Sequence, residues 1–110
     1  MFKTKTFPFK KFGKTRNLCF GLSQYSYNGN LAIEAYDADN GEPYASVTVN
    51  LGLLLPEFAF IDVNNFPEIK EILESLGIAK YAGATRCSGY CKYPLYQFEM
   101  DKLKEYSVIL

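Results

Sequence analysis

An Asn-Gly pair at positions 28–29 constrains the fold of this chain more than any other feature of its sequence. It separates two stretches, 18–27 and 30–36, in which apolar and polar residues alternate. Asn-Gly is preferred in two-residue type I′ turns, and alternation is typical of strands with one buried face. A two-residue turn sets Leu22 opposite Ala35. Five apolar side chains then share the core face of the hairpin: Phe20, Leu22, Leu31, Ile33 and Ala35.

A second turn signal, Asp-Asn-Gly at 39–41, predicts that the chain reverses again. The pattern of apolar residues on either side decides the length of the loop. A three-residue loop with Gly41 in the left-handed conformation sets Ile33 opposite Val47, whereas a two-residue loop sets Ile33 opposite Thr48. We therefore expect the three-residue loop.

One helix is predicted over residues 66–76. Asn65 is a suitable N-cap, Glu68 stands three residues later as in a capping box, and Gly77 is a helix terminator. The apolar residues between these ends recur at the spacing of one helix face: Ile69, Ile72, Leu73 and Leu76. Such a stripe predicts a helix that lies against a sheet.

The other predicted elements are strands over 44–51, 57–63 and 93–100, a loop over 83–89 and a helical turn over 101–106. A chain of 110 residues falls in the commonest size range of single domains. We therefore expect one α+β domain over residues 1–110. Its core is an antiparallel β-meander of about five strands with one helix packed on one face.

Positive charge is concentrated at the start of the chain. Six basic residues precede the first acidic one: Lys3, Lys5, Lys10, Lys11, Lys14 and Arg16. Residues 1–16 thus carry +6, and the remainder, with six basic and twelve acidic residues, carries −6. Two interpretations of residues 1–16 stay open. They form either a basic arm that binds a partner, with nucleic acid as a candidate, or an edge strand whose lysines discourage edge-to-edge pairing.

The chain contains no histidine. This excludes Ser-His-Asp and Cys-His nucleophilic sites, imidazole general bases and zinc sites that use histidine. Cys19, Cys87 and Cys91 are one ligand short of a closed tetrahedral site, and we expect buried or partly buried structural thiols. The spacing of the carboxylates selects no acid/base pair. We therefore expect a protein that is not an enzyme, with no catalytic residues, no metal and no cofactor.

The sequence also bears on localisation. It has no stretch close to the roughly 20 apolar residues of a membrane span, and no signal-peptide pattern at its start. The odd number of cysteines implies no disulfide framework. We expect a cytoplasmic protein that does not associate with a membrane.

The segment 88–98 holds four of the chain's tyrosine and phenylalanine rings within nine positions. Gly89 and Pro94 bracket part of it, which predicts an irregular surface segment. Tyrosine offers a stiff contact surface with a hydroxyl group, which suits a binding surface. The predicted partner-binding residues are Tyr90, Lys92, Tyr93 and Tyr96. We expect a protein partner, because an acidic body opposes phosphate. A core strand and a base-stacking surface are the alternatives.

Three segments together resemble a known family: Thr48 to Leu51, Phe60 to Asn65, and Ser88 to Phe98. The chain resembles a family of small uncharacterised proteins, a domain of unknown function carried by bacterial plasmids, conjugative elements and phages. The resemblance implies a mobile-element setting and no catalytic residues. Proteins of such elements often act against host defence, so the resemblance implies an inhibitor of a restriction or CRISPR nuclease as one function. A nucleic-acid-binding accessory protein is the alternative.

Overall fold

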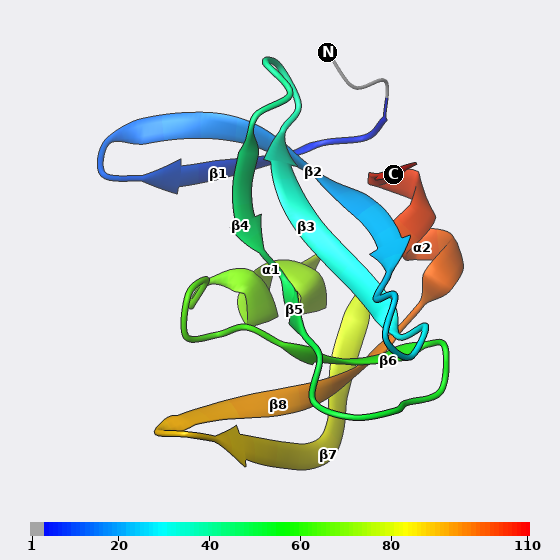
Figure 1. The fold of residues 1–110 in the computed structure, drawn as a ribbon. Coiled ribbons are helices and arrows are strands. Elements are labelled where there is room, and N and C mark those ends of the chain that lie inside the picture. The colour runs from blue at the N-terminus through cyan, green and yellow to red at the C-terminus, as the bar shows by residue number, and fades with distance from the viewer. Residues whose placement is uncertain (1–3) are drawn as a thin grey trace.

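The computed structural model describes residues 4–110. Within these residues the chain forms nine strands and two short helices (Figure 1). All strand pairs but one are antiparallel. The predicted α+β class with an antiparallel sheet is therefore confirmed. The strands form two sheets, however, and a second helix joins the predicted one.

The first sheet has the order β1-β2-β3-β4, and a short ninth strand pairs in parallel with β2 beside β1. Its strands are β1 (Phe7–Lys11), β2 (Lys14–Gln24), β3 (Leu31–Asp37), β4 (Pro43–Ser46) and β9 (Ser107–Ile109). The second sheet has the order β5-β6-β8-β7. Its strands are β5 (Thr48–Val49), β6 (Phe58–Ile61), β7 (Ala79–Ser88) and β8 (Cys91–Phe98). The helices are α1 (Ile69–Ser75) and α2 (Met100–Glu105).

The chain passes from the first sheet to the second at Val47, which is buried. The Val47 N–H donates to the carbonyl of Ile33 in β3, while the Val47 carbonyl accepts from Asp62 after β6. The single strand predicted over 44–51 is therefore wrong, because β4 and β5 belong to different sheets. The expected proximity of Ile33 and Val47 is confirmed.

The β3–β4 loop has the predicted conformation at Gly41 but not the predicted length. Gly41 has a φ of 77°, the left-handed conformation that was predicted. The loop is one residue longer than expected, because Asp37 N–H donates to the Glu42 carbonyl and four residues lie between them. A register shift between Ala35 and Tyr36 compensates for the extra residue.

The β2–β3 hairpin has the predicted core face but not the predicted register. Leu22 lies opposite Ile33, two residues from the expected partner, and an even shift leaves every side chain on its own face. All five predicted core residues are buried. The turn is longer than two residues, because Tyr25 N–H donates to the Asn30 carbonyl. Asn28 bonds through its side chain to the Asn30 N–H.

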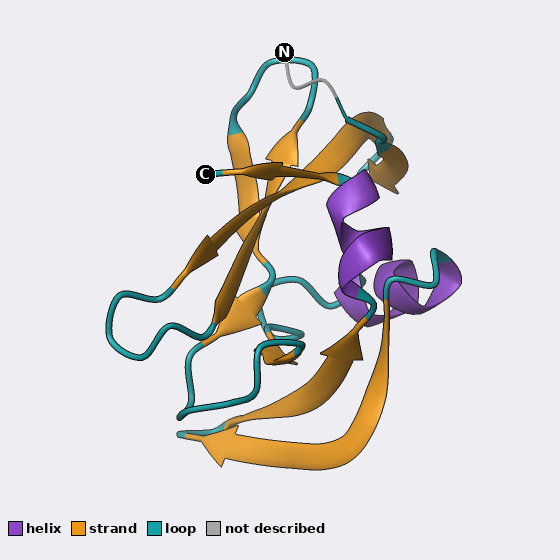
Figure 2. Ribbon diagram, turned by 90° about the vertical axis from the view of Figure 1, so that its right-hand side faces the viewer, coloured by secondary structure: helices purple, strands orange, loops and turns teal. Residues whose placement is uncertain are grey.

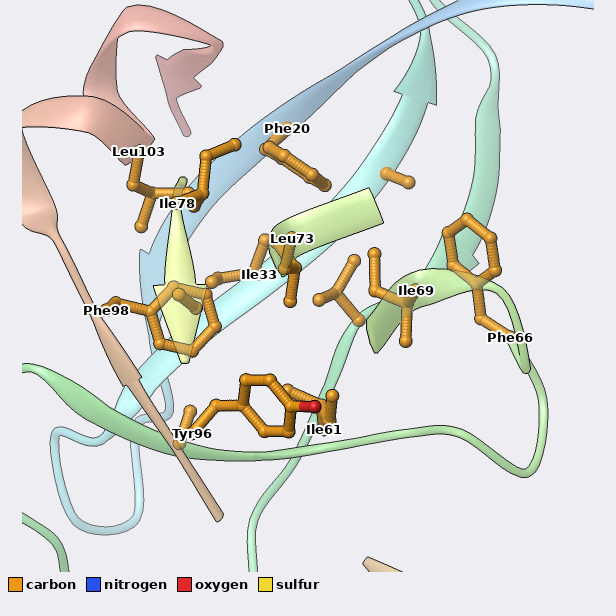
Figure 3. Close-up of a cluster of buried hydrophobic side chains, with 14 of the residues drawn as sticks. Phe20, Ile33, Ile61, Phe66, Ile69, Leu73, Ile78, Tyr96, Phe98 and Leu103 are labelled. Carbon is orange, nitrogen blue, oxygen red and sulfur yellow. The ribbon is translucent and has the colours of Figure 1, made fainter. Parts of the chain in front are cut away.

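Helix α1 begins at Ile69, three residues later than predicted, and ends before Gly77, whose φ is 70°. The capping box does not form, since Asn65 donates its side-chain amide to Asp62 instead of capping the helix. Ile69 and Leu73 are fully buried. Figure 3 shows them between side chains of both sheets, so α1 fills the gap between the sheets rather than covering one face.

Two further segments differ from the prediction. Residues 83–89, expected as a loop, belong largely to β7, and the final strand β9 was not foreseen. The helical turn expected over 101–106 is confirmed as α2. In Figure 2 the first sheet occupies the upper part of the view and the β7–β8 hairpin the lower part.

Residues 7–11 of the basic N-terminal segment form the edge strand β1. Phe7 and Phe9 are buried, and the Phe9 ring lies 5.4 Å from that of Phe66. Of the two interpretations of residues 1–16, the structure matches the edge strand carrying lysines over residues 7–11. Lys3 lies outside the described residues.

Candidate binding surface

The β7–β8 hairpin extends beyond the rest of its sheet. Strand β6 pairs with β8 only at residues 95–97, so residues 82–94 form a two-stranded projection, which we call the ribbon. It points to the lower left in Figure 1. Pro94 is tolerated because β6 does not extend along this part of β8 and needs no N–H donor there. The turn consists of Gly89, with a φ of 61°, and Tyr90.

The β7 strand and the tip of the ribbon are exposed, whereas in β8 Lys92 is exposed and Cys91, Tyr93 and Pro94 are half-buried. Every residue from Lys80 to Tyr90 is exposed to solvent, and the Tyr90 side chain is fully exposed. Core packing therefore does not account for an aromatic ring at this tip. Large exposed rings on a projecting element are typical of contact surfaces.

The ribbon and its base carry positive charge only. No acidic residue lies between positions 77 and 98, whereas Lys80, Arg86 and Lys92 are cationic. Arg86 uses its guanidinium group to donate to the Leu51 carbonyl. Lys80 and Lys92 are both exposed. The ribbon is thus a basic projection from a body that is acidic outside its first sixteen residues.

The structure separates the four predicted partner-binding residues. Tyr90 is at the tip, and Lys92 is exposed on one face of the ribbon, opposite Cys87. Tyr93 is half-buried on the other face, opposite Arg86. Tyr96 is only 1% exposed and belongs to the core, so its placement on a contact surface is wrong. Three of the four side chains remain available.

Tyr96 is buried because the fold covers the base of β8 and not its tip. Its neighbour on β6 is Ala59, and its hydroxyl donates to the carboxylate of Glu74 on α1. Burial, and then the hydrogen bond to Glu74, raise the pKa of Tyr96. Tyr96 is therefore a neutral donor that anchors the base of the ribbon to the helix.

Tyr93 is also held in its neutral form. A hydrogen bond with Cys91, and then burial, raise the pKa of Tyr93. Its hydroxyl thus keeps a proton at physiological pH. Neither tyrosine has the lowered pKa that a general base at neutral pH would need.

The ribbon is tied to a neighbouring apolar loop over residues 51–55. Gly52 has a φ of 115°, a backbone conformation that favours glycine, and it lies close to Arg86, since a Cβ atom there would be 2.9 Å from Arg86 Nη1. Leu53 and Leu55 are 77% and 65% exposed. This run lies mostly between the strands predicted over 44–51 and 57–63 and was given no functional role, although its closely spaced leucines were the available signal.

A buried asparagine holds the same loop from the other side. Asn30 is 5% exposed, and its side chain donates to Asn50 Oδ1 at 3.0 Å and to the Gly52 carbonyl at 2.6 Å. Its Oδ1 accepts from the Leu54 N–H at 3.0 Å. The two exposed leucines therefore stand on a loop that is hydrogen-bonded on both sides.

The three cysteines are free and lie apart. Cys19 is buried, Cys87 is exposed, and Cys91 is half-buried. Cys87 and Cys91 pair with adjacent positions across the hairpin, which puts them on opposite faces. The prediction of a buried or partly buried thiol is therefore wrong for Cys87. Among residues 4–110 no three Cys, Asp or Glu side chains gather as a metal site requires. The absence of a metal remains a prediction.

Three of the basic residues considered for nucleic acid have acidic partners. The ion pairs are Lys5 with Glu105 at 2.7 Å, Lys11 with Glu68 at 3.0 Å and Arg16 with Asp37 at 3.7 Å. Lys10 and Lys14 are exposed. Between them Phe12 is 94% exposed at the β1–β2 turn, with a φ of 55°.

A family model described as a domain of unknown function (DUF4313) matches residues 19–108. The chain belongs to the DUF4313 family. The matched part of this DUF4313 chain includes the ribbon and the 51–55 loop, and it begins inside β2, after β1. No curated protein and no solved structure matches the chain. None of the helices described here, in residues 4–110, is long and apolar enough to cross a membrane.

Proposed function

We propose that this DUF4313 domain is a non-catalytic protein-binding module whose contact surface is the ribbon, centred on Tyr90, Lys92 and Tyr93. The observation that carries the proposal is the fully exposed Tyr90 ring at the tip of a ribbon whose β7 strand is exposed along its length. Tyrosine is among the residues that contribute most to protein interfaces, because it buries a large stiff surface at low entropic cost.

The anchoring of the ribbon supports the same proposal. Tyr96 bonds to Glu74 at its base, and Arg86 bonds to the Leu51 carbonyl along its length. A contact surface that is ordered before it meets its partner loses less conformational entropy on binding.

The proposal extends to the setting. The domain is a cytoplasmic accessory protein of a mobile genetic element or phage, and its partner is a host protein. An inhibitor of a restriction or CRISPR nuclease is the form of this function that the family resemblance suggests, which is an argument by association.

The test is capture of a host protein from a nuclease-treated bacterial lysate with wild type, Tyr90→Ala and Tyr27→Ala. Tyr27 is a matched control, since it is another exposed tyrosine on a hairpin turn, between β2 and β3. Truncating a central interface tyrosine costs about 2 kcal/mol, or roughly thirtyfold in affinity. We expect Tyr90→Ala to lose the partner and Tyr27→Ala to keep it. Equal capture by all three proteins contradicts the proposal.

Nucleic-acid binding by the β1–β2 hairpin is the second candidate. The observation that favours it is Phe12, an exposed ring in a strained backbone conformation beside two exposed lysines, Lys10 and Lys14. Aromatic rings among cations can stack on unpaired bases. A single-stranded oligonucleotide should then bind with an affinity that falls steeply with salt and is weakened by Phe12→Ala. Absence of binding at low salt rules this candidate out.

A further inference from the structure

The outer edge of β7 has no strand partner within residues 4–110. β7 stands at the end of the second sheet and pairs with β8 alone. An unpaired edge strand presents a row of backbone N–H and C=O groups that can bind another extended chain. Every residue of β7 after Ala79 is exposed, so no side chain of the fold covers this edge.

The other edges are protected or short. β1 carries Pro8 and two lysines, and β4 has four residues and contains Pro43. β5 has two residues and β9 has three. β7 has ten residues and no proline. Its one protection is the irregularity between Tyr81 and Thr85, which leaves 85–88 as a regular open edge.

We propose that the edge of β7 over residues 85–88 binds an extended acidic segment of the partner protein as an added strand. The inference rests on the proposed function and names how the ribbon holds its partner. Charge determines the kind of segment. Arg86 is part of this edge, Lys92 pairs with Cys87 across the hairpin, and Lys80 lies nearer the base of β7. No acidic residue lies between positions 77 and 98. A second copy of the chain would bring like charges together, whereas an acidic segment complements them.

The two faces of the ribbon favour alternating side chains in the added strand. Cys87 and Lys92 lie on one face, and Arg86 and Tyr93 on the other. Successive side chains of an added strand point to opposite faces. Acidic residues at every second position would then lie on the side of Lys92. The apolar residues between them would lie against the Tyr93 ring and the aliphatic part of Arg86, whose guanidinium group already donates to the Leu51 carbonyl.

The probe is a labelled peptide of alternating Glu and Val, about eight residues long, which is the length of an ordinary strand. Its binding to the full chain is measured by fluorescence anisotropy, with an alternating Lys and Val peptide and a Glu and Val peptide with a central proline as controls. We expect only the uninterrupted acidic peptide to bind. Amide hydrogen exchange should slow at residues 85–88 when it does.

The matched variants are Lys80→Glu with Lys92→Glu, and Lys10→Glu with Lys14→Glu on the other basic hairpin. Both double variants change the net charge equally, and all four lysines are exposed. We expect the first variant to lose at least tenfold in affinity and the second to lose little. Circular dichroism verifies that both are folded.

Three outcomes overturn the inference: no binding of the acidic peptide, equal loss in both variants, or binding without slower exchange in β7. Dimerisation through β7 would also overturn it in favour of a second copy. If the acidic peptide does not bind while Tyr90→Ala still abolishes capture of a host protein, the added-strand inference is contradicted and the proposed protein-binding function is not. If Tyr90→Ala captures as wild type does, the proposed function falls as well.

Discussion

The β1–β2 and β7–β8 hairpins are built alike but differ in how the rest of the fold uses them. Both have a two-residue turn, both carry lysines, and each presents an exposed ring at its tip, Phe12 or Tyr90. β1–β2 places Phe7 and Phe9 in the core. The ribbon part of β7–β8 stands free of the core. Two hairpins with similar lysines and aromatic rings can therefore have different roles. A hairpin whose rings are buried stabilises the core, whereas one whose rings are exposed can contact a partner.

The charges of the two hairpins show the same difference. Lys5, Lys11 and Arg16 each meet a carboxylate from another part of the fold. Between β7 and β8 no acidic residue interrupts the cations. The N-terminal segment has the higher charge in the sequence, yet three of its cations are paired with carboxylates, whereas no ion pair is formed by Arg86 or Lys92 of the ribbon within residues 4–110. Counting charges along the chain therefore does not show which cations are already paired with carboxylates.

The largest expected effect separates the buried ring of one hairpin from the exposed ring of the other. Phe9→Ala removes a ring that contacts both Tyr44 and Phe66, and should lower the free energy of unfolding by about 3–5 kcal/mol. Tyr90→Ala should change it by less than about 0.5 kcal/mol. Urea denaturation of the two variants measures both. Similar losses would show that the ribbon is part of the folded core.

A smaller effect marks where the ribbon joins the core. Tyr96→Phe removes the hydrogen bond to Glu74 and should cost about 1–2 kcal/mol. The pKa of Tyr96 is raised on folding, so this stabilisation is present below about pH 10, the ordinary tyrosine value, and is lost as the pH rises above it. Wild type should therefore lose more stability than Tyr96→Phe between pH 9 and 11. Parallel pH profiles would contradict this.

The tip of the β1–β2 hairpin should gain stability on substitution. Phe12 and Gly13 both have positive φ, and Phe12 is the one non-glycine residue with this conformation among residues 4–110. Phe12→Asn should stabilise the protein by about 1 kcal/mol, because asparagine tolerates this conformation and suits this turn type. Tyr90→Asn serves as the control and should be neutral. If Phe12→Asn has a melting temperature no higher than that of wild type, the positive φ of Phe12 does not strain the backbone.

The smallest expected effect concerns a neutralised cation. Burial raises the pKa of Glu68, but the hydrogen bond from Lys11, a backbone hydrogen bond and the charge of Lys11 together outweigh burial, so the pKa is lowered. The stabilisation is thus present above about pH 4.3 and is lost as the pH falls through that range. Lys11→Met should cost less than about 1 kcal/mol at pH 7, and the difference from wild type should vanish near pH 3. Lys92→Met should have no effect on stability at either pH.

Local sequence determined the faces of the strands in the β2–β3 hairpin and the C-terminal end of helix α1. The alternation around Phe20 and Ile33 assigned both to the core, and glycine at 41 and 77 marked left-handed positions. These features depend on residues within a few positions of one another. The same reasoning found the tyrosine-rich segment and placed Tyr90 on the surface.

Tertiary structure decided the rest, because contacts between distant residues outweighed local preference. Asn28 and Asn30 bond to Asn50, twenty or more positions away, which favours the longer β2–β3 turn over the type I′ turn that Asn-Gly prefers. Helix α1 covers Tyr96 but not Lys92, although both residues lie on the same face of β8. The sequence placed both residues on the contact surface, and only the packing of α1 and β6 determined that Tyr96 is buried.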